Sequence, residues 1–357
     1  MLEKYITKNG KKLRLGFTTG TSAALAAKAS TMMLTTGKKN DTVNLLTPSG
    51  IDIETEVFDQ EIADDYAVCS VIKDAGDDPD VTDGIKIFAK VKINYSNEIR
   101  VIGGIGIGTV TKKGLSVIIG EKAINPVPKK MIIDAVRSVS SCSGFDVEIF
   151  IPQGEEIAKK TFNEKLGVVG GISIIGTTGI VKPMSEEAII ESLFLELNIL
   201  REVSDKVILV FGNYGEKFAV ETLGIEKNLV VNMSNFCGEM LKKANELGFK
   251  KITLIGHIGK ILKLAGGIFN THSKYADART EILSSHYGYY SGDIEALKNI
   301  FESNTSEEAC EYIKDKNFYS YFADVIKKKC REYVDNEKMD LKIIIFSQEK
   351  GLLGESK

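Results

Sequence analysis

The chain has 357 residues and a formal net charge of −3; 43% of its residues are hydrophobic and 27% are charged. This is the composition of an ordinary soluble globular protein, and the length favours two hydrophobic cores over one. A charge so close to zero draws neither nucleic acid nor an anionic membrane to the molecule as a whole. An anionic partner would therefore have to meet a local basic patch.

Five cysteines are scattered along the chain without a C-x-x-C pair: Cys69, Cys142, Cys237, Cys310 and Cys330. This spacing favours reduced thiols over a disulfide framework or a zinc site. No stretch approaches ~18 uninterrupted apolar residues, and the N-terminus lacks an apolar export segment. We therefore expect a cytoplasmic protein that is neither exported nor inserted in a membrane.

The first 150 residues have the order of a mixed α+β domain. An alanine-rich apolar segment at residues 20–34 predicts a helix, and the threonine, serine and glycine residues before it supply cap chemistry. A strand is predicted at 115–120, and prolines open a predicted helix at 125–140. β-Rich segments with partial alternation occupy residues 42–48, 51–58, 66–76 and 85–93.

From about residue 151 the order changes to repeated strand–turn–helix units. Four apolar segments end in turns of glycine and small polar residues: Gly176–Gly179, Gly212–Gly215, Asn232–Asn235 and Gly256–Gly259. Such units predict a parallel sheet with helices on its faces. Helical patterns fill much of 274–336, and 341–347 offers a last strand. The sequence thus predicts two domains, an α+β domain over 1–150 and an α/β domain with C-terminal helices over 151–357.

The four turns also predict where a ligand would bind. Ligands of open parallel sheets bind beyond the carboxyl ends of the strands, where glycine permits close backbone approach and helix N-termini offer free N–H groups. Turns between strands and helices often have this composition without binding anything, which is the alternative for each turn taken singly. None has the G-x-G-x-x-G order and nothing matches a P-loop, so a classical NAD or P-loop site is unsupported.

Two other motifs each allow two interpretations. The loop 73–84 carries five aspartates but fails the EF-hand rule, because Ile85 stands where the last glutamate ligand should be. A solvated loop or a substrate-facing turn is favoured there over a divalent ion site. The run Gly103–Gly108 could cradle an anion through its N–H groups, or it could form a bulge or a flexible turn.

The stretch from Gly256 to Arg279 concentrates polar side chains around an apolar middle. The chain's histidines, His257, His272 and His286, are too widely spaced for an H-x-x-x-H metal pair, and no G-x-S-x-G elbow accompanies them. Structural histidines are the alternative to any such site. The basic residues instead favour the binding of carboxylates; they are His257, Lys260, Lys263, His272, Lys274 and Arg279.

Lys260 and Lys263 are three residues apart, so on a helix they would share one flank while the apolar residues between and beyond them pack inward. A merely solvated helix face is the alternative for this pair.

Six long segments together resemble one family: residues 13–29, 71–84, 103–115, 120–132, 151–188 and 256–279. They include "LRLGFTTGTSAALAAKA", "VIKDAGDDPDVTDG" and "GHIGKILKLAGGIFNTHSKYADAR". In this order they resemble the CbiD-type cobalt-precorrin-5B (C1)-methyltransferases of anaerobic cobalamin biosynthesis. Two positions depart from the family pattern: Ser22 stands where cysteine is common, and Asp83 where histidine is frequent. Neither position is therefore given a catalytic role.

The resemblance implies S-adenosylmethionine as methyl donor and cobalt-precorrin-5B, a carboxylate-fringed corrinoid precursor, as acceptor. Methylation at ring carbon C1 would give cobalt-precorrin-6A. No protein-bound metal is expected, because the substrate brings its own cobalt. The resemblance also implies an α+β N-terminal domain and a Rossmann-like C-terminal domain. A homo-oligomer is possible.

The donor is expected at two glycine-rich turns, at Gly176, Thr177, Thr178, Gly179, Gly212, Asn213 and Gly215. The acceptor's carboxylates are expected at His257, Lys260, His272, Lys274 and Arg279. Asp277 is a candidate for a base or for a residue that orients Arg279, and an ion-pair partner on a helix surface is the favoured alternative. A non-catalytic corrinoid or tetrapyrrole carrier is the alternative, since it would use the same basic pocket without a donor site. A nucleotide-dependent oxidoreductase lacks the glycine fingerprint it would need.

Overall fold

The computed structural model describes residues 2–8, 10–94, 96–141 and 143–357. Contacts within the chain divide it into two compact units, residues 1–186 and 187–357. Of the five cysteines, Cys142 lies outside the described residues, and the other four are buried as free thiols. No helix among the described residues is both long and apolar enough to cross a bilayer.

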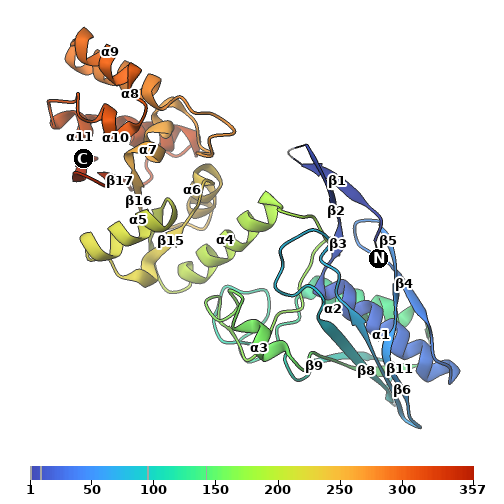
Figure 1. Ribbon diagram of the computed structural model, residues 1–357. Coiled ribbons are helices and arrows are strands. Elements are labelled where there is room, and N and C mark those ends of the chain that lie inside the picture. The colour runs from blue at the N-terminus through green and yellow to red at the C-terminus, as the bar shows by residue number, and fades with distance from the viewer. Residues whose placement is uncertain (1, 9, 95, 142) are drawn as a thin grey trace. The chain divides into compact units, whose positions relative to one another are not determined.

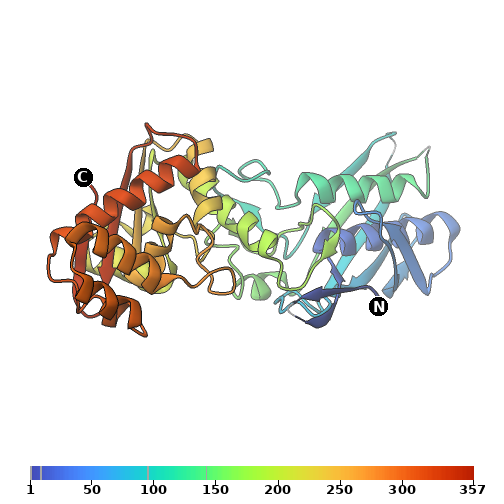
Figure 2. The same cartoon turned by 90° about the horizontal axis from the view of Figure 1, so that it is seen from above.

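The first unit is built on a five-stranded sheet whose order is β6-β7-β8-β11-β9. Neighbouring strands are antiparallel except β11 and β9, which are parallel. The bounds of the strands are β6 Phe58–Ile62, β7 Tyr66–Ile72, β8 Lys86–Asn94, β9 Ile99–Gly103 and β11 Gly144–Phe150. Two helices, α1 (Thr19–Thr36) and α2 (Pro126–Arg137), pack against each other and against this sheet (Figures 1 and 2).

Helix α1 confirms the helix predicted at 20–34. Thr18 caps its start by accepting a hydrogen bond from Thr21 N, and Gly37 ends it in the left-handed region, at a φ of 68°. Alanine is the best helix former and has the smallest apolar side chain, so α1 can approach β7 and β8 closely. The helix is consequently almost wholly buried.

Short elements complete the first unit. Two hairpins precede and follow α1, and two pairs of short strands join residues that lie far apart in the chain. The pairs are β1 (Tyr5–Lys8) with β2 (Lys11–Arg14), β4 (Thr42–Leu46) with β5 (Asp52–Glu56), β3 (Gly16–Phe17) with β13 (Ile180–Val181), and β10 (Thr109–Val110) with β12 (Val168–Val169); α3 is Gly154–Ala158.

The second unit is built on the sheet β15-β14-β16-β17-β18. The first four strands are parallel, and β18 is antiparallel to β17. Consecutive residues such as Leu209 and Val210, or Leu254 and Ile255, are buried on opposite faces, as is typical of a parallel sheet covered on both sides. The bounds are β14 Lys206–Val210, β15 Val230–Asn232, β16 Lys251–His257, β17 Leu341–Ser347 and β18 Gly351–Glu355.

Helices cover both faces of this sheet. One face packs against the larger core, which includes residues of α4, α6, α8 and α11, and the other packs against Phe218 and Ala219 of a short π-helix. The α-helices are α4 Glu186–Arg201, α5 Gly212–Lys217, α6 Cys237–Glu246, α7 Ile258–Ile261, α8 Arg279–Ser291, α9 Ile294–Glu302, α10 Ser306–Ala309 and α11 Asn317–Tyr333. The π-helix is Phe218–Thr222, and the 3₁₀ helices are Lys227–Leu229 and Leu262–Gly266.

Two predicted strands are wrong. Residues 115–120 form turns, and Ile118 is 72% exposed, because no other strand pairs with this segment among the described residues. Residues 170–179 make only isolated bridges there, Ile172 to Ile107 and Ile174 to Ile124. This segment therefore joins the first unit and not the parallel sheet. For the same reason the boundary expected at residue 150 falls inside the first unit, since β12 and β13 pair back to β10 and β3.

The Gly103–Gly108 run packs backbone against backbone. A Cβ on Gly106 would overlap Ile151 O, and Gly154 and Gly171 both lie directly against Gly106. The amides of Gly104 and Gly108 donate to carbonyl oxygens of Ile149 and Ile172. These N–H groups are therefore occupied, which favours a packed turn over an anion cradle.

We predict that Gly106→Ala lowers the stability of the first unit strongly. Gly106 has a φ of 73° and no room for a Cβ, whereas Gly50 has a φ of 75° and open space around it. Both alanine variants carry the left-handed backbone cost of about 1–2 kcal/mol, but only Gly106→Ala adds overpacking of about 1–3 kcal/mol. Calorimetric unfolding should show the larger loss in Gly106→Ala. Equal losses in the two variants would contradict the packed turn.

Candidate ligand-binding edge of the second unit

The carboxyl ends of four parallel strands meet at one edge of the second unit. Along the chain, β15 follows β14 and lies on one side of it, while β16 lies on the other. The connections therefore leave in opposite directions between β14 and β16. A topological switch point of this kind is where ligands of open α/β sheets bind.

The turns after β14 and β15 are tied together by Asn232. Its Oδ1 accepts hydrogen bonds from Gly212 N and Ser234 N, both at 3.0 Å. Gly212 has a φ of 65°, and a Cβ placed on it would have nothing within 4 Å, so its Cα faces open space. Asn213 is exposed, and Gly215 is buried. Of the predicted donor residues, these three lie at the switch point.

His257 ends β16, and both of its ring nitrogens are occupied. Nδ1 accepts from Gly259 N at 3.2 Å, which leaves Nε2 to donate to Glu307 Oε1 at 2.6 Å. Glu307 also accepts from Ser347 Oγ at 2.5 Å and from Gln348 N at 2.9 Å, so it joins α10 to the end of β17. These contacts are those of a structural histidine, and substrate binding by His257 stays a prediction.

Lys260 is a half-buried cation beside this network. Its Nζ donates to Asn235 Oδ1 at 2.9 Å, and within the described ranges no carboxylate lies within ion-pair distance of it. Burial, and then the charge of Lys263, lower the pKa of Lys260. A cation with only an amide oxygen as partner is poorly compensated, so an anionic ligand would stabilise it.

The spacing predicted that Lys260 and Lys263 share one flank of a helix, but Lys260 lies in α7 and Lys263 is buried in the 3₁₀ helix that follows. Its side chain is only 3% exposed, because the chain from Asn270 to Asp277 folds over it. The ammonium donates to Thr271 O at 3.1 Å and to Ala276 O at 2.7 Å, and it lies 3.7 Å from Asp277 Oδ1.

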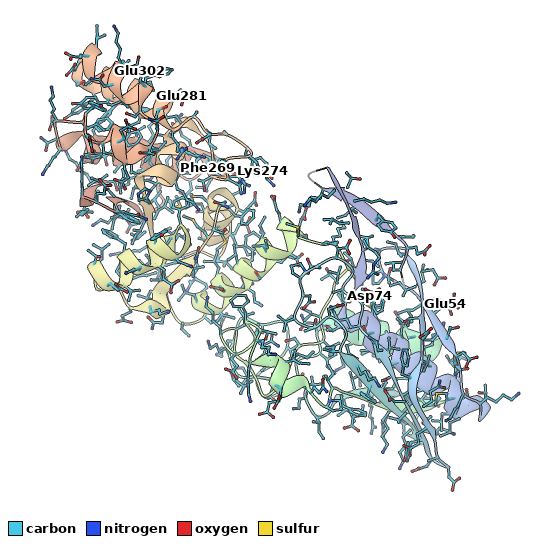
Figure 3. All side chains as sticks on the ribbon, in the orientation of Figure 1. Glu54, Asp74, Phe269, Lys274, Glu281 and Glu302 are labelled. Atoms are coloured by element: carbon cyan, nitrogen blue, oxygen red, sulfur yellow. The ribbon has the colours of Figure 1, made fainter. Side chains whose placement is uncertain are left out.

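The loop over Lys263 carries two of the predicted acceptor residues. His272 and Lys274 are both exposed, and His272 Nδ1 accepts from Lys274 N at 3.1 Å. The Lys274 ammonium lies 4.8 Å from the centre of the Tyr275 ring. Figure 3 shows Phe269 where the loop begins and Lys274 on the loop itself.

Asp277 is engaged by two cations. Its carboxylate accepts from Arg279 Nε at 2.5 Å and from Arg279 Nη2 at 3.0 Å, and it also faces Lys263. The hydrogen bonds from Arg279 lower its pKa, with smaller contributions from the two positive charges. A carboxylate held in this way is a weak base, and it is better suited to orienting Arg279.

Gly176–Gly179 lie in the first unit, where they close on the start of α1. Thr21 Oγ1 donates to Gly179 O at 2.7 Å, and Ser49 N donates to Thr178 O at 3.2 Å. The expectation that this turn lies at the edge of the parallel sheet is wrong. Donor binding by Gly176, Thr177, Thr178 and Gly179 stays a prediction, but a shared sheet edge no longer supports it.

The aspartates of the loop 73–84 are used within the first unit. Arg14 donates to both oxygens of Asp74, at 2.5 and 2.7 Å, and Lys73 donates to Asp80 at 2.7 Å (Asp74 is labelled in Figure 3). Across the part of the chain that the structure describes, no group of three histidine, cysteine or acidic residues is arranged to hold a metal ion. The loop is therefore a braced turn.

Comparison with known proteins decides the family. The CbiD family model matches residues 6–183, and that of the CbiD C-terminal domain matches residues 270–357. A protein of Thermoanaerobacter sp. (strain X514) is 45% identical over 99% of this chain and 98% of its own length. A protein of Clostridioides difficile (strain 630) is 44% identical over 99% and 97%. Both are named cobalt-precorrin-5B C(1)-methyltransferase.

The chain belongs to the CbiD family. Among solved structures, the cobalamin biosynthesis protein (cbiD) from Archaeoglobus fulgidus matches with a TM-score of 0.40 and 29% identity, over 80% of this chain and 88% of its own. The relatives from Thermoanaerobacter and Clostridioides cover the stretch between the two family models, which includes β14, β15 and β16.

The two departures from the CbiD pattern have structural partners. Ser22 is fully buried in α1, and its Oγ donates to Thr18 O at 3.1 Å. Asp83 Oδ1 accepts from Ala75 N at 2.7 Å, which closes the braced turn. That neither residue has a catalytic role stays a prediction.

Three residues of this edge in the CbiD chain had no individual role in the sequence analysis, although one of them, Asn235, belongs to a turn predicted to bind a ligand. Glu307 lies 50 residues after His257, and no local pattern marks it. Asn235 accepts from Lys260 Nζ at 2.9 Å. It also holds the following loop, since Thr271 N donates to Asn235 O at 3.0 Å and Thr271 Oγ1 donates to Asn235 Oδ1 at 3.4 Å. The small polar residues of the turn Asn232–Asn235 are the signal that pointed to Asn235, and they do not reach Thr271 or Glu307.

We predict that Glu307→Gln destabilises the second unit in a pH-dependent way. Burial opposes ionisation of Glu307, but the hydrogen bonds from Ser347, Gln348 N and His257 outweigh it and lower its pKa below the usual 4.5. The ionised group therefore stabilises the fold above about pH 4.5, and this contribution is lost as pH falls through the folded-state pKa. Near pH 7 the variant should lose about 1–2 kcal/mol.

Urea unfolding of both proteins between about pH 7 and about pH 3 measures this difference. The difference in free energy of unfolding between wild type and Glu307→Gln should become smaller at acid pH. Glu302→Gln on α9, an exposed position, is the control and should change little (Figure 3). A gap that is constant down to the lowest pH would refute the stabilising role of the Glu307 carboxylate.

Proposed function

We propose that this CbiD-family chain is an S-adenosylmethionine-dependent methyltransferase. It methylates C1 of cobalt-precorrin-5B to give cobalt-precorrin-6A in anaerobic cobalamin biosynthesis. The observation that carries the proposal is the identity of 43–45% with curated relatives of that name, over almost the whole of this chain and of theirs. A sheet edge with a switch point and an uncompensated lysine supports it.

The main task of the protein in this reaction is to position the two reactants. The bond between the donor's methyl carbon and sulfur breaks as the bond to C1 of the macrocycle forms, and S-adenosylhomocysteine leaves. Such an in-line displacement is accelerated by holding the two reactants in line and by excluding water. The substrate carries its own cobalt, so the chain's residues need only bind and orient the reactants.

We place the donor at the carboxyl ends of β14 and β16, close to Gly212, Asn213 and Gly215. The open space at Gly212 lets a ligand approach the backbone there. The four parallel strands and their order suit a Rossmann-like domain, and the first unit suits an α+β domain. These domain assignments, a cytoplasmic location and a homo-oligomeric state belong to the same proposal.

We place the acceptor's carboxylates at Lys260 and at the loop that follows, with His272, Lys274 and Arg279. Lys260 is the strongest of these candidates, because its charge has no carboxylate partner among the described residues. Arg279 is already paired with Asp277, and the two hydrogen bonds fix the orientation of the Arg279 guanidinium. We assign Asp277 this orienting role.

The direct test is anaerobic incubation of the chain with cobalt-precorrin-5B and S-adenosylmethionine labelled at the methyl group. The expected product carries the label at C1, located by mass spectrometry and NMR, with S-adenosylhomocysteine released in equal amount. Tight corrinoid binding without donor binding would instead identify a non-catalytic carrier. A label at another ring carbon would contradict the proposed position.

We predict that the two subsites can be separated by two substitutions. Gly212→Ala should raise the Kd of S-adenosylhomocysteine about tenfold (roughly 1.4 kcal/mol) and change the corrinoid KM little. Lys260→Ala should raise the corrinoid KM and change the Kd of S-adenosylhomocysteine little. Titration calorimetry measures the first quantity and steady-state methylation the second.

Matched controls exist for both substitutions. Gly224 has a φ of 66° and open space, like Gly212, but it follows the π-helix, so Gly224→Ala carries the same backbone cost away from the edge. Lys298→Ala removes an exposed lysine of α9. If Gly212→Ala and Gly224→Ala weaken donor binding equally, the donor does not bind at β14.

A further inference from the structure

Lys263 is a buried ammonium with a complete set of acceptors. Two of its N–H groups donate to the carbonyl oxygens of Thr271 and Ala276, at 3.1 and 2.7 Å, and Asp277 Oδ1 lies at ion-pair distance, 3.7 Å. A lysine side chain that is only 3% exposed loses its hydration, which is unfavourable unless the protein replaces it. Here backbone carbonyls and one carboxylate replace it.

The loop over Lys263 is held at both of its ends. At the first end, Thr271 N donates to Asn235 O at 3.0 Å, and Phe236 forms a bridge with Asn270. At the second end, Lys263 holds Ala276 O, and Lys263 and Arg279 together hold the Asp277 carboxylate. The Lys263 ammonium therefore joins the two ends of the loop, since it donates to Thr271 O at one end and to Ala276 O at the other.

The residues between these ends point their side chains outward. His272, Lys274 and Tyr275 are exposed, and their local backbone bonds include Tyr275 N to His272 O at 3.0 Å and Lys274 N to His272 Nδ1 at 3.1 Å. Lys260 lies at the base, joined to the same Asn235 that holds Thr271. The basic side chains of His272 and Lys274 are thus exposed on the loop, while the Lys263 side chain that holds the loop is buried.

We propose that Lys263 is a positioning residue for the acceptor. It pins the loop 271–277 so that His272 and Lys274, and Arg279 through Asp277, are in place before the polycarboxylate binds. The inference rests on the proposed function, because it takes the acceptor's carboxylates to bind at this loop. Fixing these side chains in advance reduces the ordering that binding would otherwise require.

The experiment compares Lys263→Met with wild type by hydrogen exchange and by methylation kinetics. Methionine has nearly the same length and fills the space without donating a hydrogen bond. Amides of residues 272–277 should exchange at least about tenfold faster in the variant, while those of β14 and α11 are unchanged. The corrinoid KM should rise about tenfold, and the Kd of S-adenosylhomocysteine should stay within about twofold.

Two further variants sharpen the result. Lys263→Arg keeps the positive charge and should recover part of the loss in KM, which a purely apolar packing role would not produce. Lys298→Met on α9 makes the same chemical change at an exposed lysine and should alter neither readout. If Lys263→Met does not fold, Lys263→Gln, which retains a donor, is measured in the same way.

Faster exchange of the loop with an unchanged corrinoid KM would overturn the positioning role and leave the proposed function intact. If the amides of residues 272–277 are unprotected from exchange in the wild type, Lys263 does not fix the loop. If wild type transfers no methyl group, the proposed function fails separately, and the exchange measurement still decides whether Lys263 holds the loop.

Discussion

The parallel order of β14, β15, β16 and β17 is the constraint on which the rest of the second unit depends. It brings four carboxyl ends to one edge, and the reversal of strand order between β14 and β16 makes a switch point there, the place where ligands of open α/β sheets bind. Three segments distant in the chain reach the same place because of this order: the turn at Asn235, the start of α7 and the helix α10. At this edge His257 is hydrogen-bonded to Glu307, and Lys260 is hydrogen-bonded to Asn235.

Within this edge, hydrogen bonds separate structural groups from groups that can take a ligand. His257 and Glu307 satisfy each other, and Asp277 is shared by Arg279 and Lys263. Lys260 differs because its described partner is a neutral amide. In the first unit the aspartates of the loop 73–84 look as polar in the sequence, yet Arg14 and Lys73 already engage Asp74 and Asp80. The sequence shows charge, but only the structure shows which charge is compensated.

Elements whose signal is local could be predicted. The alanine-rich helix and the strand–turn–helix units at β14, β15 and β16 follow from periodicity and from glycine turns, which need no knowledge of partners. The segment 170–179 has the same apolar pattern, but single bridges to Ile107 and Ile124 place it in the first unit. Lys263 was expected on the same helix flank as Lys260, because no local pattern shows that the chain folds back over it. Glu307 was missed for the same reason.

A lysine under the loop provides something that an apolar residue could not. Carbonyl groups of a loop that crosses strand ends have no ladder partner, and an ammonium can donate to several of them from one point. Its charge also remains at the edge. Among the described residues, Asp277 is the one carboxylate within ion-pair distance of Lys263 and Arg279, and Lys260 has only an amide partner, so these four side chains together carry a net charge of +2 in a chain whose formal net charge is −3. The local basic patch that an anionic partner requires is thus built from the same contacts that fix the loop, and binding a polycarboxylate there would neutralise charge that the fold has already concentrated.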